Sequence, residues 1–342
     1  NLSRPYQKSF SYHTMRVYSV IIREEHHQTA CDHLLQDAHQ EDLCFAAYSL
    51  STGANRTTAI ISEIILPLSG ERNVHGNVGF LPAYFQRAMQ IAMSRKEGLV
   101  LMHSHMTNGW QNMSEDDINT ESSVAPPVQG ATGFPFVGLT VGRDGAWRAR
   151  FWIKDLYKKR QYNRHWCHTV RRIGKKLSIT FNDNLLAPAF DRDKQLRTIS
   201  AWGSATQEDI SRLRIGIVGL GSVGSIVAEI LARTGISHFT LVDFDSVETK
   251  NLDRLTGVFK EDVGRAKVDV IREAIRRSAS SPHITIDTCE YSICERQGFE
   301  QALDCDIIFS CVDRPWPRQV LNFIAYAHLI PVIDGGILVR TD

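Results

Sequence analysis

The sequence predicts an α/β protein of two domains, an α+β domain followed by a domain with a mainly parallel, doubly wound sheet. Three observations support this prediction. The chain has 342 residues, a length that suggests roughly two domains. Strand-like and helix-like segments are mixed up to about residue 153, as in α+β domains. From residue 213 onwards strands and helices alternate, which is typical of parallel doubly wound sheets.

The elements of the N-terminal domain, residues 1–153, follow from hydrophobic periodicity. Alternating or short apolar runs predict strands, and apolar residues spaced three or four apart predict helices. We expect strands at 16–22, 43–50, 58–66, 98–105, 136–141 and 147–153. We expect helices at 29–39 and 83–95.

The segment 154–176 has a different character, because it is dense in lysine and arginine and its one acidic residue is Asp155. It predicts a basic linking helix, with a turn-rich connector to residue 189. A solvated helix face is favoured over a docking surface for an acidic partner. The second domain is expected over residues 190–342, with strands at 213–218, 239–242, 284–288, 307–312 and 332–333 and helices at 223–233 and 267–278.

Composition and charge exclude several classes of protein. Hydrophobic residues make up 43% of the chain and charged residues 23%, which is ordinary for a globular protein. The net charge of +1 at pH 7 gives no indication of a nucleic-acid or membrane partner. No apolar run approaches the ~20 residues that span a bilayer. Residues 1–10 are polar and lack the apolar core of a signal peptide.

Seven cysteines occur without a Cys-x-x-Cys pair, so neither a disulfide framework nor a four-cysteine zinc site is expected. Reduced thiols and a cytoplasmic location are expected instead. The chain starts at Asn1 and ends at Asp342, directly after a strand-like segment. We therefore expect it to be a fragment of a longer protein.

A cluster of metal-binding residue types follows the apolar strand at 98–105. His103 and His105 are two residues apart, so their side chains point to the same side of a strand. Asp117 offers a third ligand. The fourth coordination position of the metal is then open to water, which suits catalytic zinc, because zinc lowers the pKa of bound water. A nearby carboxylate must then accept a proton and pass it to the leaving amine. Taken singly, the histidines also fit a polar loop, and Ser114 with Asp117 fits a helix cap.

This arrangement resembles the JAB/MPN metalloprotease family, whose JAMM motif combines a distant glutamate, His-x-His-Pro and Ser-x-x-Asp. The resemblance covers about residues 14–153. It implies that His103, His105 and Asp117 bind zinc, and that Ser114 supports the tetrahedral intermediate. It also implies that Glu41 is the general base, and that the reaction cleaves an isopeptide or peptide bond after the tail of a ubiquitin-like protein.

The sequence departs from this motif in two places. Met106 replaces the usual proline, and the loop between His105 and Ser114 is one residue longer than in the family. Asp116 therefore remains an alternative ligand. Glu63, in a later strand, remains an alternative base.

The C-terminal domain begins with a glycine-rich loop between a strand and a helix. Gly219, Gly221 and Gly224 form the pattern G-x-G-x-x-G, which lets the backbone approach phosphates at a helix N-terminus. Asp243 ends the next strand, where it can hold ribose hydroxyls. These features alone fit a nicotinamide dehydrogenase. The following segments carry further polar groups that favour a magnesium triphosphate instead: the amide of Asn251, the cations Arg254 and Lys267, and the carboxylate of Asp313. Taken singly, each of these residues also fits a surface charge or a cap.

The set is similar to the ThiF/ubiquitin-activating adenylyltransferase family, over about residues 190–342, and the fold implied is Rossmann-like. The resemblance implies that Asp243 binds ribose, that Asp313 holds Mg²⁺, and that ATP phosphates contact Asn251, Arg254 and Lys267. Arg192 resembles the arginine that reaches ATP in the partner subunit, although Asp191 replaces an aromatic residue. Family members continue beyond the segment matching Gly335 and Gly336, often with a reactive cysteine that none of the seven cysteines here matches.

Together the two resemblances imply a fusion of the kind found in bacterial ubiquitin-like modification operons, including those of antiphage defence. Such an enzyme processes a ubiquitin-like protein and adenylates its C-terminal carboxylate. A homodimer through the adenylyltransferase domain and a conjugating-enzyme-like partner are implied as well. The alternatives are a sulfur-carrier activating enzyme for cofactor synthesis, a scaffold with an inactive metal site, and, more remotely, a dehydrogenase.

Overall fold

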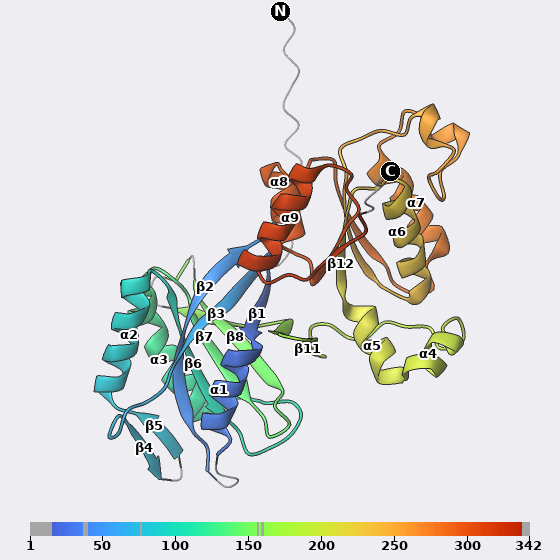
Figure 1. The fold of residues 1–342 in the computed structure, drawn as a ribbon. Helices are drawn as coiled ribbons and strands as arrows, with labels where there is room; N and C mark the ends of the chain where they lie inside the picture. The colour runs from blue at the N-terminus through green and yellow to red at the C-terminus, as the bar shows by residue number, and fades with distance from the viewer. Residues whose placement is uncertain (1–15, 37–39, 76, 156, 159–160, 337–342) are drawn as a thin grey trace, which may run out of the picture.

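The computed structural model describes residues 16–36, 40–75, 77–155, 157–158 and 161–336. These residues form a large N-terminal sheet, a smaller C-terminal sheet and a two-stranded hairpin, with helices on the sheet faces (Figure 1). Among them, no helix combines the length and the apolar character needed to cross a bilayer.

The N-terminal sheet has nine strands in the order β11-β10-β1-β3-β2-β6-β7-β8-β9. Parallel and antiparallel pairs are mixed, as expected for an α+β domain. The strands are β1 (Val17–Arg23), β2 (Leu43–Thr52), β3 (Arg56–Ile65), β6 (Gly98–Ser104), β7 (Phe136–Val141), β8 (Trp147–Lys154), β9 (Tyr162–Trp166), β10 (Thr169–Ile173) and β11 (Leu177–Phe181). A separate hairpin consists of β4 (Arg72–His75) and β5 (Asn77–Phe80).

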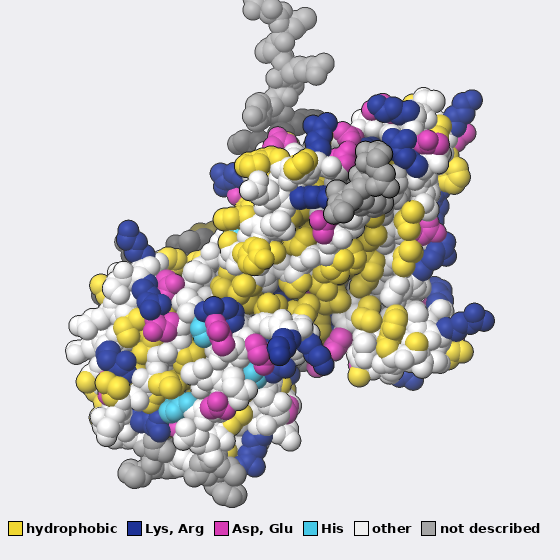
Figure 2. Space-filling model, in the orientation of Figure 1, with side chains coloured by type: hydrophobic (Ala, Val, Ile, Leu, Met, Phe, Trp, Pro, Cys, Tyr) yellow, Lys and Arg dark blue, Asp and Glu magenta, His cyan; other side chains and the backbone are white. Residues whose placement is uncertain are grey.

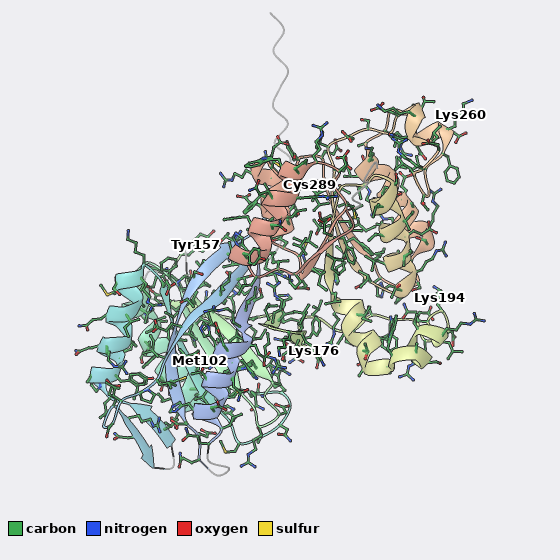
Figure 3. The ribbon with its side chains drawn as sticks, viewed as in Figure 1. Met102, Tyr157, Lys176, Lys194, Lys260 and Cys289 are labelled. Carbon is green, nitrogen blue, oxygen red and sulfur yellow. The ribbon has the colours of Figure 1, made fainter. Side chains whose placement is uncertain are left out.

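Helices cover both faces of this sheet. Helix α1 (Glu24–Leu34) packs on one face, and α2 (Pro82–Arg95) and α3 (Glu115–Thr132) pack on the other. Successive residues of β2 therefore enter two different cores, and this explains why the strand is almost uniformly apolar. Figure 3 shows side chains filling the space around the sheet, and Met102 of β6 is fully buried.

The expected linking helix over residues 154–176 is wrong for the described residues. They contain β9, which pairs with β8, and β10, which pairs with β1, so the sheet continues to Phe181 instead of ending near 153. In β10 two adjacent arginines, Arg171 and Arg172, lie between Val170 and Ile173, and Arg171 is fully buried beside a carboxylate. Neither strand alternates apolar and polar residues, so the hydrophobic period gave no strand signal and the charge density dominated the prediction. The first helix also begins earlier than expected, and residues 37–39 lie outside the described residues.

The C-terminal sheet has the order β14-β13-β12-β15-β16, and its four pairings are all parallel. The expected mainly parallel sheet is therefore confirmed. Its strands are β12 (Arg214–Val218), β13 (His238–Val242), β14 (Thr285–Cys289), β15 (Ile307–Ser310) and β16 (Val332–Asp334). One face packs on α6 (Ser222–Thr234) and α7 (Lys267–Ser278), the other on α8 (Arg296–Ala302) and α9 (Pro315–Ala327). Helices α4 (Leu196–Trp202) and α5 (Ser204–Arg212) precede the sheet.

Buried charges join the two parts of the chain. The Arg56 guanidinium at the start of β3 donates to Asp306, with an N–O distance of 2.7 Å, and Arg171 lies 3.6 Å from the same carboxylate. Asp304 accepts the backbone N–H groups of Asn55 and Arg56 at 2.8 and 2.9 Å. The turn between β2 and β3 is therefore held against the segment that leads into β15.

Candidate metal centre and candidate nucleotide site

The structure brings the three predicted metal ligands together. The Nε2 atoms of His103 and His105 are 3.2 Å apart, and each lies 3.4 Å from an oxygen of Asp117. Donor atoms about 2.0–2.1 Å from one zinc ion in tetrahedral geometry are separated by about 3.3 Å. Two imidazole nitrogens and one carboxylate at this spacing therefore fit zinc. Their role as ligands stays a prediction.

Asp117 is fixed in place by the start of α3. Ser114 is the N-cap of the helix: its Oγ accepts the Asp117 N–H at 3.1 Å, and Asp117 Oδ2 accepts the Ser114 N–H at 2.8 Å. The expected helix cap is thus present, and it directs the carboxylate towards the histidines. Burial disfavours the charged carboxylate, but hydrogen bonds from His105 and Ser114 outweigh it, and the pKa of Asp117 lies well below its usual range.

The two histidines differ in their electrostatic surroundings. Burial, together with the charge of Arg150, lowers the pKa of His103 to about 3, so this imidazole is neutral and able to bind a metal. The hydrogen bond to Asp117 raises the pKa of His105 despite its partial burial. A neutral imidazole and an ionised carboxylate are the protonation states that a metal needs.

Glu41 lies in the same pocket, which has a volume of about 610 Å³. Burial raises the pKa of Glu41; the charge of His105 opposes this shift and that of Asp117 adds to it. A raised pKa suits a group that takes and returns a proton near neutral pH. The walls also include Ser114, the apolar residues Leu43, Leu101 and Met113, and the strand β5 residues Val78, Gly79 and Phe80.

The two alternative residues from the sequence analysis, Asp116 and Glu63, lie in different places relative to the pocket. Asp116 lines the pocket, but the three convergent donor groups are those of His103, His105 and Asp117. Glu63 lies on β3 and forms an ion pair of 2.5 Å with Arg95 of α2, and it does not line the pocket. The geometry therefore favours Asp117 as the ligand and Glu41 as the base.

Sequence reasoning missed a polar network behind the histidines. Thr140 Oγ1 lies 3.3 Å from His103 Nε2 and accepts a hydrogen bond of 2.5 Å from Arg150. Arg150 also pairs with Glu121, and all three side chains are fully buried. Two features of the sequence could have indicated this network: an arginine inside the apolar strand at 147–153, and a glutamate four residues after Asp117.

The glycine loop has the geometry that the sequence predicted. Gly219 has a φ of +88°, in the left-handed region that favours glycine. A Cβ on Gly224 would lie 1.9 Å from the carbonyl oxygen of Gly219, so the first turn of α6 needs glycine there. A Cβ on Gly221 would meet no atom within 4 Å, so the space beside this residue is open to a ligand. These positions suit a phosphate at the N-terminus of α6.

Asp243 supports this loop from the end of β13. One carboxylate oxygen accepts the Leu220 N–H at 2.6 Å and the other accepts the Asp245 N–H at 2.8 Å. Burial raises the pKa of Asp243 in spite of these hydrogen bonds. Lys267, the first residue of α7, pairs with Asp245 at 2.7 Å, which places its ammonium group close to the loop.

The other predicted nucleotide residues are placed unevenly. Asn251 caps its own turn, with Oδ1 accepting the Glu248 N–H at 3.0 Å. Arg254 is exposed and donates to Asp253 at 2.9 Å. Asp313 follows β15, whose end is paired with β12 next to the glycine loop, so it lies at the expected edge of the sheet. Arg192 is exposed before α4, with its guanidinium over the ring of Phe190.

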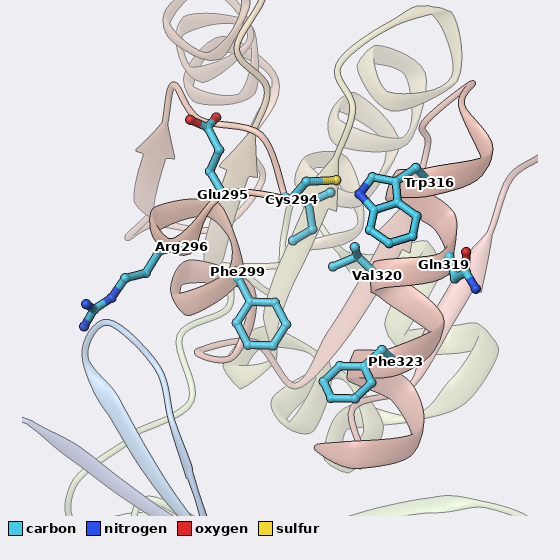
Figure 4. A pocket seen from close by; sticks show the side chains of 9 residues that line it. Cys294, Glu295, Arg296, Phe299, Trp316, Gln319, Val320 and Phe323 are labelled. Atoms are coloured by element: carbon cyan, nitrogen blue, oxygen red, sulfur yellow. The ribbon is translucent and has the colours of Figure 1, made fainter.

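An apolar cleft of about 430 Å³ lies elsewhere in the C-terminal domain. Figure 4 shows that Phe299 of α8 faces Val320 and Phe323 of α9, with Cys294 near Trp316. All seven cysteines are free thiols, and Cys294 is the exposed one. Figure 2 shows hydrophobic side chains gathered around this part of the chain.

A parallel sheet with a glycine loop at its carboxyl edge defines residues from 213 onwards as a nucleotide-binding domain of Rossmann-like type. Comparison with protein families makes this assignment more specific. Residues 192–341 match the ThiF family, so this part of the chain is a ThiF domain.

Curated relatives agree with this assignment. The molybdopterin-synthase adenylyltransferase of Escherichia coli (strain K12) is 32% identical over 130 residues, covering 38% of this chain and 51% of the relative. A ubiquitin-like modifier-activating enzyme 5 from Oryza sativa subsp. japonica is 36% identical over 129 residues, covering 34% of this chain and 30% of the relative. The chain thus spans about half, or less, of the length of these relatives. A crystal structure of E. coli tRNA N6-threonylcarbamoyladenosine dehydratase, TcdA, aligns at 28% identity over 44% of this chain and 63% of that one, with a TM-score of 0.40.

Proposed function

We propose that the chain is a bifunctional enzyme of ubiquitin-like protein chemistry, with a JAB/MPN-type zinc peptidase domain and an ATP-dependent adenylyltransferase domain. One observation carries the peptidase half: two imidazoles and a carboxylate converge at zinc-ligand spacing in a pocket that also holds a carboxyl group of raised pKa. The ThiF match carries the adenylyltransferase half.

In the peptidase domain, His103, His105 and Asp117 would hold zinc, which supplies Lewis acidity and acidifies a water molecule. Glu41 accepts the proton of the attacking water and passes it to the leaving amine, a task that suits its raised pKa. The Ser114 hydroxyl stands at the N-terminus of α3, where it can donate to the oxyanion that develops on the scissile carbonyl. The products are a free C-terminal carboxylate and a free amine.

In the ThiF domain, the carboxylate of a ubiquitin-like protein attacks the α-phosphorus of ATP. The new bond joins the carboxylate oxygen to phosphorus, the bond to the β-phosphate oxygen breaks, and acyl-adenylate and pyrophosphate result. The amides of the loop at Gly219 and Gly221 would face the phosphates, Lys267 and Arg254 would supply positive charge, and Asp313 would hold Mg²⁺. Neutralising the triphosphate lowers the repulsion that the incoming carboxylate meets.

The names of the relatives support the substrate class. One relative is a ubiquitin-like modifier-activating enzyme, and another is an adenylyltransferase acting on molybdopterin synthase. The second name also favours the alternative function, activation of a sulfur carrier for cofactor synthesis, with the peptidase domain maturing the carrier. A homodimer and a conjugating-enzyme-like partner belong to the proposal too; the exposed Trp316, Phe323 and Tyr326 of α9 offer a surface for such contacts.

Two variants test the proposal. Glu41→Gln should abolish cleavage of a ubiquitin-like fusion and leave ATP–pyrophosphate exchange unchanged, and Asp313→Ala should do the reverse. Circular dichroism controls for folding. If either folded variant lost both activities, the assignment of two independent sites would be wrong. Identification of the adduct that the carrier forms, an amide or a thiocarboxylate, separates the main function from the alternative.

A further inference from the structure

A fully buried ion pair lies directly behind the candidate metal centre. Glu121 follows Asp117 by four residues on α3, so both side chains project from the same face of the helix. Glu121 accepts two hydrogen bonds from Arg150 of β8, one of 2.9 Å to Nε, and a third of 2.7 Å from Trp152 Nε1. Neither member of the pair is exposed to solvent.

The sheet is shaped to admit this pair. Gly138 of β7 lies opposite Arg150 in the β7–β8 register, and a Cβ on it would come within 2.3 Å of the Glu121 carboxylate. Burying two charges is costly, and such a pair is often no more stabilising than apolar packing. A buried pair accommodated by glycine therefore suggests that it is retained for the position it imposes on α3.

The network also reaches the other ligand-bearing element. Thr140 of β7 is the register partner of His103 on β6, and its Oγ1 lies 3.3 Å from His103 Nε2. Arg150 donates a hydrogen bond of 2.5 Å to the same oxygen. Arginine can only donate, so the Thr140 oxygen accepts from it, and this hydrogen bond holds the hydroxyl against the imidazole of His103. The contact restricts the rotation of the ring that carries one of the proposed metal ligands.

Building on the proposed metal site, we propose that Thr140, Arg150 and Glu121 are positioning residues of the metal centre. Arg150 connects the two arms. Through Glu121 it fixes the face of α3 that carries Asp117, and through Thr140 it restricts the imidazole of His103, whose Nε2 faces the ligand cluster. The three residues thereby set the orientation of ligands on two separate elements before a metal arrives.

Thr140→Val tests this proposal, because valine keeps the shape of threonine and removes the hydroxyl. The measurements are Zn²⁺ affinity, by competition with a chromophoric chelator, and the absorption spectrum of the Co²⁺-loaded protein, which reports coordination geometry. We expect Zn²⁺ affinity to fall about 10–100-fold, as it does when groups that orient metal ligands are removed. We also expect the Co²⁺ spectrum to change. Thr140→Ser keeps the hydroxyl and should restore both values.

Thr58→Val is the matched control. Thr58 is a buried threonine of β3 in the same sheet, with its hydroxyl 2.8 Å from Ser19 Oγ. It should lose stability to a similar extent with no change in Zn²⁺ affinity or Co²⁺ spectrum. If Thr140→Val does not fold, Thr140→Ala, compared with Thr140→Ser, tests the same hydroxyl.

The possible results separate this proposal from the proposed function. If the wild-type protein binds Zn²⁺ and Thr140→Val binds it equally well with an unchanged Co²⁺ spectrum, the positioning role is refuted and the metal site stands. If the wild-type protein itself binds no Zn²⁺, the proposed peptidase function fails first. A lower unfolding temperature with unaltered metal binding assigns Thr140 a purely structural role and also refutes the proposal.

Discussion

Asp306 is expected to be the most sensitive single position for the contact between the two parts of the chain. Its carboxylate accepts from Arg56 at 2.7 Å and from the Arg214 backbone N–H at 3.0 Å, and it lies 3.6 Å from Arg171. The side chains of Arg56, Arg171 and Asp306 are each at most 2% exposed. Asp306→Ala would therefore leave two guanidinium groups buried without this carboxylate.

The size of the effect follows from this burial. Removing one partner of a buried ion pair costs about 3–5 kcal/mol, and a typical domain is stable by only about 5–15 kcal/mol. An exposed pair gives the comparison: Glu229 and Arg233 are 27% and 63% exposed, and breaking such a pair costs no more than about 0.5 kcal/mol. Glu229→Gln is therefore the matched control.

Urea unfolding followed by circular dichroism measures both variants against the wild-type protein. We expect the free energy of unfolding to fall by about 3–5 kcal/mol in Asp306→Ala and to change by less than about 0.5 kcal/mol in Glu229→Gln. A loss below about 1 kcal/mol in Asp306→Ala would refute the reasoning, because it would mean that the buried guanidinium groups find other partners or water.

Three further predictions concern pH and the nucleotide site. Burial alone would raise the pKa of Asp306, but the charges of Arg56 and Arg171 bring this pKa below its usual value. The carboxylate therefore stabilises the fold fully above about pH 4, and this stabilisation is lost as the pH falls through the lowered pKa. The difference in unfolding free energy between wild type and Asp306→Ala should shrink only in that acidic range, and a difference that already shrinks near pH 6 would contradict this prediction. Gly221→Ala should weaken ATP binding in calorimetry with little change in melting temperature. Gly224→Ala should also destabilise the fold, since its Cβ would meet a carbonyl oxygen at 1.9 Å. Equal melting temperatures of the two variants would contradict this prediction. Lys267→Ala should lower ATP affinity about 10–100-fold, the value of a charge-assisted hydrogen bond of about 1.5–3 kcal/mol, and unchanged affinity would exclude a phosphate contact.

Much of the fold could be predicted from local sequence. The strand at Phe136–Val141 and the helix at Lys267–Ser278 have the predicted bounds, because the first is a short, fully buried apolar run and the second follows the helix period. The strands β9 and β10 were missed because local charge density dominates the pattern there. The charge of Arg171 is neutralised by Asp306, which is remote in sequence, so no local rule predicts its burial.

The candidate site was predictable to a similar degree. His103, His105 and Asp117 could be grouped because each is tied to an element end with a recognisable signal, a strand end or a helix cap. The link from Thr140 to Arg150 could not be predicted from the sequence, since it depends on which strands are neighbours in the sheet. The role of Arg192 stays a prediction, because its expected contact involves a partner subunit and the structure contains a single chain.

The most direct test of the account is the zinc content of the purified, metal-replete protein, measured by elemental analysis. One zinc per chain is predicted for the wild type, and almost none for the folded variant in which both His103 and His105 are alanine. Wild-type protein without zinc, or a double variant that retains it, would contradict the proposed metal centre.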